Sequence, residues 1–192
     1  VTSGKIWLKG EDISSFKGKE LSGYRGKAIG YLFQEFELLD NLTGRENIIL
    51  PLSLHGMTGR ESESSLKRLA WHFGIEDELD KFPSQMSGGQ KQRVAAARAL
   101  IGNPGIVLAD EPTGALDSRN SKVLMDRLSA LNEDEGRTIV MVTHDANAAS
   151  YCSRILFIQD GRLFHELRRN VRTETTERFY ERIVTVLSQL GG

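Results

Sequence analysis

The sequence predicts an α/β protein built on a parallel β-sheet, and three features support this fold class. Ile106 to Ala109 and Thr138 to Val142 are short, continuously apolar runs rich in β-branched residues, as is typical of parallel strands covered on both faces. Between them, Ser121 to Asn132 has a helical pattern. A strand, a helix and a strand in this order form a right-handed crossover unit, which joins parallel strands of one sheet.

The composition indicates one soluble domain without a nucleic-acid partner. A chain of 192 residues can bury a sizeable core and is typical of one domain. Its 25 Lys and Arg against 26 Asp and Glu give a net charge of -1, so no overall field attracts nucleic acid or an anionic membrane. Its apolar runs are far shorter than the roughly 18 residues of a membrane span. The single cysteine, Cys152, excludes an internal disulfide and suits a reducing cytosol.

The first part of the chain changes from strand patterns to helix patterns. Lys5 to Leu8 and Ala28 to Phe33 read as short strands. From Thr43 to Phe73, apolar residues recur every three or four positions, which predicts an all-helical lobe. The stretch between the two strands is expected to form turns, because it contains the four glycines Gly10, Gly18, Gly23 and Gly26.

A further helix is expected in the middle of the chain. It should begin near Ser87, because serine is a preferred helix cap, and run through the alanine-rich segment to Leu100. The Gly-Asn-Pro-Gly cluster at residues 102–105 should end it. After this cluster the chain returns to strand patterns.

The C-terminal segment predicts a hairpin and a helix. Ile155 to Ile158 and Arg162 to His165 form the hairpin across Asp160-Gly161, a sequence that favours a tight turn. The helix after it has an apolar stripe that either packs on its own domain or forms a surface for a partner. This stripe consists of Phe179, Ile183, Val186, Leu187 and Leu190.

Two adjacent carboxylates, Asp110 and Glu111, directly follow the first central strand. In α/β proteins, ligands bind at the carboxyl edge of the parallel sheet, where such residues lie. An acidic pair at this place can hold a hydrated Mg²⁺ through the first carboxylate and polarise an attacking water with the second. Alone, such a pair is more often the start of a solvated loop.

The segment Ser87-Gly88-Gly89-Gln90 lies at the predicted start of a helix. The free backbone N–H groups and the positive end of the helix dipole favour a phosphate there, and two glycines let the phosphate approach the main chain. The alternative is an ordinary serine-capped helix.

Two further polar residues follow predicted strands. His144 comes after the second central strand, so it should lie at the same sheet edge, where an imidazole can donate to a terminal phosphate oxygen. Gln34 follows the strand that ends at Phe33 and can offer an amide oxygen to a metal ion or to the nucleophilic water.

Together these residues resemble the nucleotide-binding subunit of ABC transporters across essentially the whole chain. Gln34 matches the Q-loop of that family, His144 the switch histidine, and Asp110-Glu111 the Walker B pair. Ser87, Gly88, Gly89 and Gln90, preceded by Met86 where leucine is commoner, match the signature motif, and Ala115, Leu116 and Asp117 match the D-loop. The run from Asp110 to Asp117 resembles the branch that serves macrolide export and lipoprotein release. Within this branch, the segment Ala149 to Arg154 and the tail from Phe179 to Gly192 are similar to bacitracin-type resistance and sensing ATPases.

The resemblance implies a P-loop NTPase (RecA-like) core of one ABC ATPase domain. Residues 1–35 and 102–166 would form parts of the α/β core, 36–101 the inserted helical lobe, and 167–192 a C-terminal helical extension. The phosphate-binding loop itself is absent, because no Gly-Lys pair is followed by Ser or Thr. We therefore expect the sequence to lack the amino-terminal segment of the family.

The resemblance also implies a mechanism. Two copies would pair head to tail with ATP and Mg²⁺, and Ser87 and Gly89 of one copy would contact the γ-phosphate held by the other. Glu111 would act as general base, Asp110 and Gln34 would hold Mg²⁺, and His144 would position the phosphate. The dimer would drive an integral-membrane permease at the cytoplasmic face of a bacterial membrane, in some relatives beside a sensor histidine kinase.

Two other classes of function remain open from the sequence. One is a regulatory ABC module without catalytic competence, which follows if the chain binds no triphosphate. The other is an ABC ATPase without a transport role, which usually carries a second nucleotide domain or a long coiled coil. Nucleotide binding discriminates the first of these from a transport ATPase.

Overall fold

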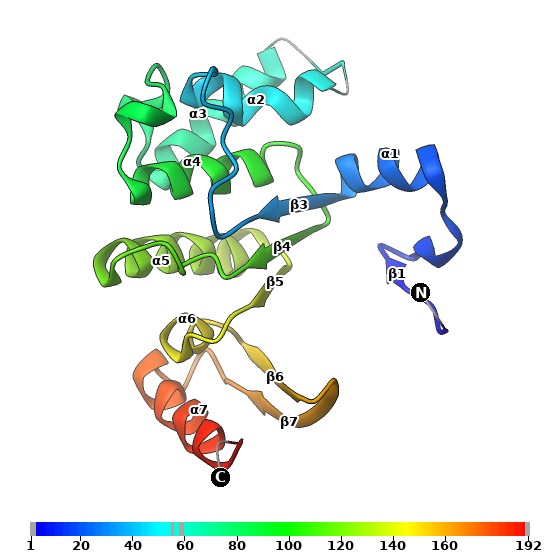
Figure 1. The fold of residues 1–192 in the computed structure, drawn as a ribbon, viewed down its shortest axis with the longest axis vertical. Coiled ribbons are helices and arrows are strands. Elements are labelled where there is room, and N and C mark those ends of the chain that lie inside the picture. Colours follow the sequence, from blue (N-terminus) through cyan, green and yellow to red (C-terminus); the bar gives the residue numbers. More distant parts are fainter. Residues whose placement is uncertain (1–2, 55, 58–59, 191–192) are drawn as a thin grey trace.

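A computed structural model describes residues 3–54, 56–57 and 60–190 (Figure 1). Its central sheet is parallel, with the strand order β3 (Ile29–Leu32), β4 (Ile106–Asp110) and β5 (Ile139–Val142). Leu32 pairs with Ala109, and Asp110 pairs with Val142, so all three strands end near one edge. The predicted α/β class and its parallel sheet are confirmed.

Helix α4 (Gly88–Leu100) connects the sheet to the helical part of the chain. It packs on β3 and also on α2 (Gly44–Leu54), α3 (Arg60–Phe73) and α5 (Ser118–Glu135), as Figure 1 shows. Its small buried side chains allow this close packing. Gly30 of β3 permits the nearest approach, because a Cβ at this position would lie 2.1 Å from the carbonyl oxygen of Ala99. The helical pattern predicted for 43–73 is confirmed as two helices, α2 and α3, while residues 55, 58 and 59 of that range lie outside the described residues. The helix predicted for 87–100 is confirmed as α4, and α5 is longer than predicted at both ends.

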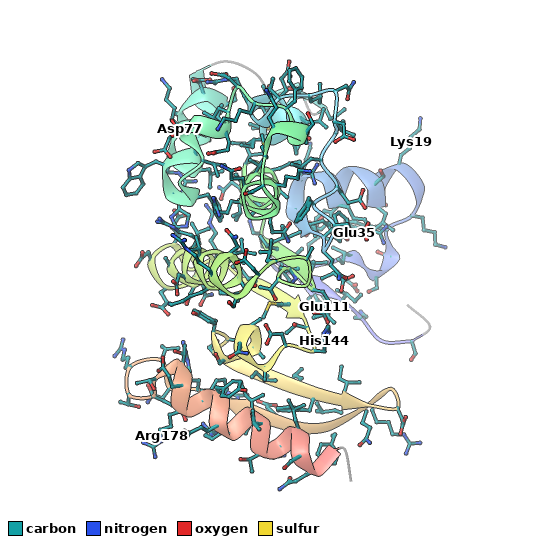
Figure 2. The ribbon with its side chains drawn as sticks, turned by 60° about the vertical axis from the view of Figure 1, so that its left-hand side comes forward. Lys19, Glu35, Asp77, Glu111, His144 and Arg178 are labelled. Carbon is teal, nitrogen blue, oxygen red and sulfur yellow. The ribbon has the colours of Figure 1, made fainter. Side chains whose placement is uncertain are left out.

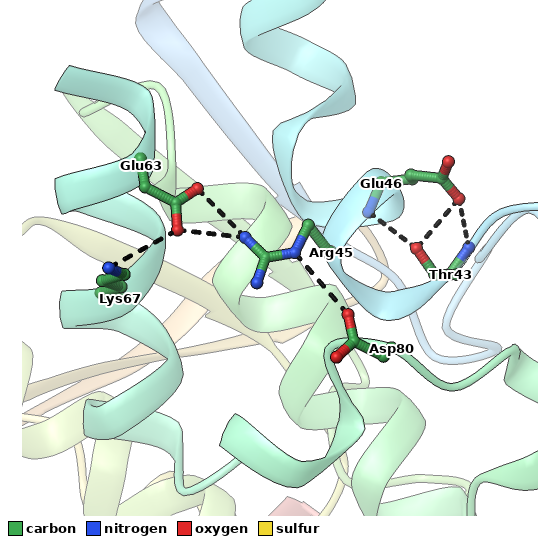
Figure 3. A network of polar contacts seen from close by, with 6 residues as sticks. All are labelled: Thr43, Arg45, Glu46, Glu63, Lys67 and Asp80. Atoms are coloured by element: carbon green, nitrogen blue, oxygen red, sulfur yellow. Dashed lines mark hydrogen bonds and ion pairs between the residues drawn. The ribbon is translucent and has the colours of Figure 1, made fainter. Parts of the chain in front are cut away.

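Local capping and a polar network fix the helical layer (Figure 3). Thr43 and Glu46 cap the start of α2 reciprocally, since Glu46 Oε2 accepts from the Thr43 amide at 2.8 Å and the Glu46 amide donates to Thr43 Oγ1 at 3.3 Å. Arg45 donates to Glu63 of α3 at 3.0 Å and lies 3.8 Å from Asp80. Two short 3₁₀ turns, η2 (Glu76–Glu78) and η3 (Pro83–Gln85), then lead to α4.

The C-terminal unit, defined as β6 (Arg154–Gln159), β7 (Arg162–Arg168) and α7 (Thr176–Leu190), has a separate core. Its strands form the predicted antiparallel hairpin, and Phe179, Ile183 and Val186 of α7 are buried against it. These three residues of the predicted apolar stripe therefore pack on their own chain. The short helix α6 (Ala146–Ser150), which the sequence did not predict, links β5 to this unit and packs on α7.

The N-terminal stretch differs from the prediction. After β1 (Trp7–Leu8), β2 (Glu11–Asp12) and the 3₁₀ turn η1 (Ile13–Ser15), residues expected to form turns make helix α1 (Gly18–Ala28). Each internal glycine disfavours a helix by about 1 kcal/mol, but the residues between them are strong helix formers. Tyr24 adds a tertiary anchor, since its ring meets Phe16 edge to face and its hydroxyl donates to Leu8 O at 3.3 Å.

None of the helices in the described ranges is both long enough and apolar enough to cross a membrane. The longest of them, α5, presents charged residues on its exposed side and buries one stripe of leucine and methionine. Such a pattern is that of a helix on the surface of a globular core.

Candidate active site at the carboxyl edge of the sheet

The parallel strands bring the predicted edge residues to one side of the sheet. Asp110 ends β4, Glu111 follows it, and His144 lies two residues beyond β5. Gln34 lies two residues beyond β3 and rests against the loop after Glu111, since a Cβ on Gly114 would lie 2.8 Å from Gln34 Nε2. The expectation that these side chains share one edge follows directly from the parallel register.

Glu111 and His144 are in direct contact (Figure 2). Glu111 Oε1 lies 2.7 Å from His144 Nδ1 and accepts from the His144 amide at 2.9 Å, while Oε2 accepts from Thr143 Oγ1 at 2.9 Å. Because an ionised carboxylate only accepts, Nδ1 carries the proton of this contact and the exposed imidazole keeps Nε2 available. The sequence indicated Glu111 and His144 but not Thr143, which no pattern distinguished.

The backbone of Glu111 is strained. Its φ of 42° lies in the left-handed region, which costs a residue with a side chain about 1–3 kcal/mol. The conformation is held by two main-chain bonds, from the Glu111 amide to Val142 O and from the Gly114 amide to Glu111 O, both at 2.9 Å. The strand end is therefore held in a geometry in which the carboxylate contacts the residues that follow β5.

The oxygen donors at this edge fit a hard divalent cation. Asp110 is exposed at the end of β4, and Gln34 offers an amide oxygen from the neighbouring strand end. Mg²⁺ prefers one or two such ligands and keeps several waters and phosphate oxygens. Within the described residues there is no cluster of three or more His, Cys, Asp or Glu side chains that would form a cage for a metal ion. A cation at this edge thus fits as a partner of a bound phosphate.

The signature segment begins α4 as an ordinary capped helix with an unusually close neighbour. Ser87 Oγ accepts from the Gln90 amide at 3.3 Å, and the Gln90 side chain accepts from the Ser87 amide at 2.7 Å. A Cβ on Gly89 would lie 2.1 Å from Asn120 Oδ1, so only glycine fits at this position. Gly88 lies beside the Phe36 ring and the Ala115 carbonyl. The signature segment therefore meets the D-loop of its own chain rather than Glu111 or His144.

The D-loop leads into α5. Ala115 is exposed, Leu116 packs against the main core, and Asp117 caps α5 by accepting from the Asn120 amide at 2.8 Å. This bond and a second one from the Asn120 side chain hold the pKa of Asp117 below its usual value. Asp117 is thus a carboxylate with fixed orientation at neutral pH.

Two residues outside the predicted set support these segments. Gln90 Nε2 of the side chain donates to Glu78, a carboxylate that is almost fully buried although it belongs to a short 3₁₀ turn. Arg98, partly buried on α4, donates to the carbonyls of Phe36 and Glu37, the two residues with φ of 62° and 49° after Gln34. Burial lowers the pKa of the Arg98 guanidinium. Neither residue had a sequence signal, because Glu78 meets the Gln90 side chain and Arg98 meets two main-chain carbonyls only after folding brings these groups together.

A parallel α/β core with a fixed carboxylate and a histidine at one edge, beside a helical layer that begins with Ser-Gly-Gly-Gln, defines the class of ATP-binding cassettes. The family described as ABC transporter matches residues 1–114, more than half of the chain. The chain therefore belongs to the ABC transporter family, as one of its ATP-binding, ATP-hydrolysing subunits.

Known relatives agree with this assignment. The bacitracin export ATP-binding protein BceA of Halalkalibacterium halodurans is 45% identical over 192 residues, which cover 100% of this chain and 75% of the relative. The uncharacterised ABC transporter ATP-binding protein YvcR of Bacillus subtilis is 48% identical over 191 residues, covering 100% of this chain and 73% of YvcR. A solved dimer of the ATP-binding cassette MJ0796, in a post-hydrolysis state with ADP and Pi, has a TM-score of 0.76 at 39% identity and covers 87% of this chain and 74% of that one.

Proposed function

We propose that Glu111 is the general base for ATP hydrolysis and that the other edge residues complete its site. The observation that carries this proposal is the Glu111 carboxylate itself, which accepts from three donors at a strand end and forms no ion pair with a Lys or Arg of the described ranges. A general base needs both a defined position and a free lone pair toward water. In the proposed step, water attacks the γ-phosphorus, its proton passes to Glu111, and the bond to the β-phosphate oxygen breaks to give ADP and phosphate.

The remaining residues take positioning and binding roles in the same proposal. His144 positions the γ-phosphate and Gln34 orients the attacking water. Asp110 and Gln34 are the residues that would hold Mg²⁺, which neutralises developing phosphate charge when bound. Ser87, Gly88, Gly89 and Gln90 lie at the start of α4, where free amides favour an anion, and are proposed to close over the ATP of a second copy. The Ala115–Asp117 segment lies beside them on the same surface.

We further propose that two copies act as a homodimer on an integral-membrane permease at the cytoplasmic face of a bacterial membrane. The relatives support this: the MJ0796 cassette is dimeric, and BceA is named for bacitracin export. The transported or sensed molecule is accordingly proposed to be a bacitracin-like antimicrobial peptide that is exported or detoxified. The link to a sensor histidine kinase and the division into a core, a lobe at 36–101 and an extension at 167–192 stay predictions.

Glu111→Gln tests the central assignment. The amide keeps the size of the side chain but cannot take up a proton, so ATP hydrolysis should fall by about 10²- to 10⁴-fold while ATP binding is retained. The measurement is phosphate release together with nucleotide binding and gel filtration, in protein expressed from its complete coding sequence. A stable ATP-bound dimer of the variant is expected.

Glu20→Gln provides the matched control, since Glu20 is exposed on α1 and far from the strand ends in sequence and fold. This variant should hydrolyse ATP at the wild-type rate. Rapid turnover by Glu111→Gln would sink the assignment of Glu111 as the base.

A further inference from the structure

Gln92 is a polar residue in the most apolar part of the molecule. It lies on α4, is fully buried, and has alanines on the following turn that are also buried. None of the motifs described above includes it. A buried amide needs hydrogen-bond partners, so its contacts indicate what it does.

Both protons of the Gln92 amide are used, and each bonds next to one of the proposed catalytic residues. Gln92 Nε2 donates to Phe33 O at 3.0 Å and to Pro112 O at 2.6 Å. Phe33 directly precedes Gln34, and Pro112 directly follows Glu111. The two carbonyl groups also define the orientation of the amide, because a flipped amide would oppose its own oxygen to both of them. One side chain thus fixes the separation of two strand ends.

The buried Gln92 side chain also has an unfavourable contribution to the free energy of folding. Gln92 Oε1 is buried and accepts no hydrogen bond from the described residues. Leaving a buried acceptor unpaired costs about 1–3 kcal/mol, and an apolar side chain of the same size would avoid this only by leaving the Phe33 and Pro112 carbonyls without this donor. Such a group belongs where the geometry that it imposes matters more than the stability that it provides.

We propose that Gln92 is a positioning residue that holds Gln34 and Glu111 at a fixed separation and ties both to the helix of the signature segment. Gln92 lies only two residues after Gln90 on α4, so a shift of this helix moves the main chain beside both catalytic residues. The inference rests on the proposed function of Gln34 and Glu111. It adds the group through which the signature helix and the hydrolytic edge of the same chain act together.

The test is Gln92→Met in protein expressed from its complete coding sequence. Methionine fills a similar volume but lacks both donors, so the fold should be kept while the two strand ends lose their link. Because a misplacement of about 1 Å can cost roughly 100-fold, we expect kcat to fall by about 10- to 100-fold. KM for ATP should stay within about threefold of wild type, since ground-state binding does not depend on the link. Rates are expressed per nucleotide-binding site, so that loss of folded protein does not imitate a loss of kcat.

Gln189→Met makes the same exchange at an exposed position of α7 and should keep the wild-type kcat. If Gln92→Met folds and keeps kcat, or loses only KM, the proposal is overturned. If it does not fold, Gln92→Asn replaces it, since the shorter amide cannot reach both carbonyls. Failure of both variants to fold would mean a purely structural role and would also overturn the proposal.

The test of Gln92 can be distinguished from the test of the proposed function. If the wild-type protein does not hydrolyse ATP, or if Glu111→Gln remains active, the proposed function fails and the role of Gln92 falls with it. If the wild type is active, Glu111→Gln is inactive and Gln92→Met retains full kcat, only the positioning role is wrong.

Discussion

The carboxyl edge of the central sheet and the C-terminal unit are stabilised by different means. At the edge, main-chain carbonyls accept from the buried Gln92 and the partly buried Arg98 side chains, and Glu111 has a left-handed backbone. In the C-terminal unit, an apolar stripe packs on a hairpin, and its charged groups pair at the surface. Its one left-handed residue with a side chain, among those described, is Asp160 in the tight turn.

The difference between the two regions lies in where strained backbone and unpaired buried polar atoms occur. Left-handed φ at Phe36, Glu37 and Glu111, and the unpaired Gln92 oxygen, lie next to residues proposed to handle ATP. Left-handed Lys9 and Asn103 lie elsewhere, and one further unpaired buried atom, Arg169 Nε, directly follows β7. In the C-terminal unit, propensity, turn chemistry and packing favour the same structure. Local conflict between sequence and structure is expected at functional sites, because their geometry must be held against the local preference.

Phe179→Ala should have the largest effect on stability and tests whether apolar packing alone holds the C-terminal unit. Phe179 is fully buried, with the Arg182 guanidinium 5.3 Å from the centre of its ring. Its loss should reduce the free energy of unfolding by about 3–5 kcal/mol, measured by denaturant titration followed by circular dichroism.

Phe164→Ala is the control, because Phe164 on β7 is 47% exposed and should lose well under half as much stability as Phe179. Equal losses in both variants would mean that the core of this unit lies elsewhere than the structure places it.

Glu37→Gly tests the strain near the edge. Glu37 has a φ of 49° and is exposed, and its carbonyl, which Arg98 contacts, is kept by glycine. Glycine removes the strain of the left-handed conformation but is more flexible in the unfolded chain, which offsets part of the gain. The net effect should stabilise the fold by about 0.5–1 kcal/mol. Differential scanning calorimetry would measure this shift.

Asp160→Gly is the corresponding variant in the C-terminal unit, and its change in stability is compared with that of Glu37→Gly. Asp160 has a φ of 51°, but aspartate tolerates this region, so stability should change by less than about 0.5 kcal/mol. If both glycine variants behave alike, strain does not distinguish the two regions.

Glu166→Gln should have the smallest effect and depends on pH. Hydrogen bonds from the Arg154 and Arg168 side chains lower the pKa of Glu166 to about 2. Because this pKa lies below that of the unfolded chain, the interaction stabilises the fold above about pH 4.5 and is lost as the pH falls toward 2. The difference in thermal midpoint between wild type and variant should therefore shrink between pH 6 and pH 2.5.

Glu181→Gln, at an exposed position on α7, should show no such pH-dependent difference from wild type. A difference for Glu166→Gln that persists unchanged at pH 2.5 would contradict the role of its charge.

Elements held by contacts between sequence neighbours were predicted correctly, whereas elements held by contacts between residues far apart in the sequence were not. The spacing of apolar residues, the serine cap and the Asp-Gly turn predicted the central strands, α4 and the terminal hairpin, since these signals come from neighbouring residues. The helix 18–28 was missed because Tyr24 anchors it to Leu8, sixteen residues earlier, which no local pattern reveals. Gln92 could have been noticed, as a polar residue three and four positions before buried alanines on one helix face.

The sequence by itself determined the fold class, the family and the residues at the strand ends, because strand pattern, motif order and spacing are properties of the chain. Only the tertiary structure decided that Thr143 and His144 hold Glu111, that Asn120 requires glycine at position 89, and that Gln92 joins two loops. These contacts link residues 20 to 59 positions apart, and both contacts of Gln92 end on main-chain carbonyls. A main-chain carbonyl is the same in every residue, so the sequence carries no sign of which one a side chain will reach.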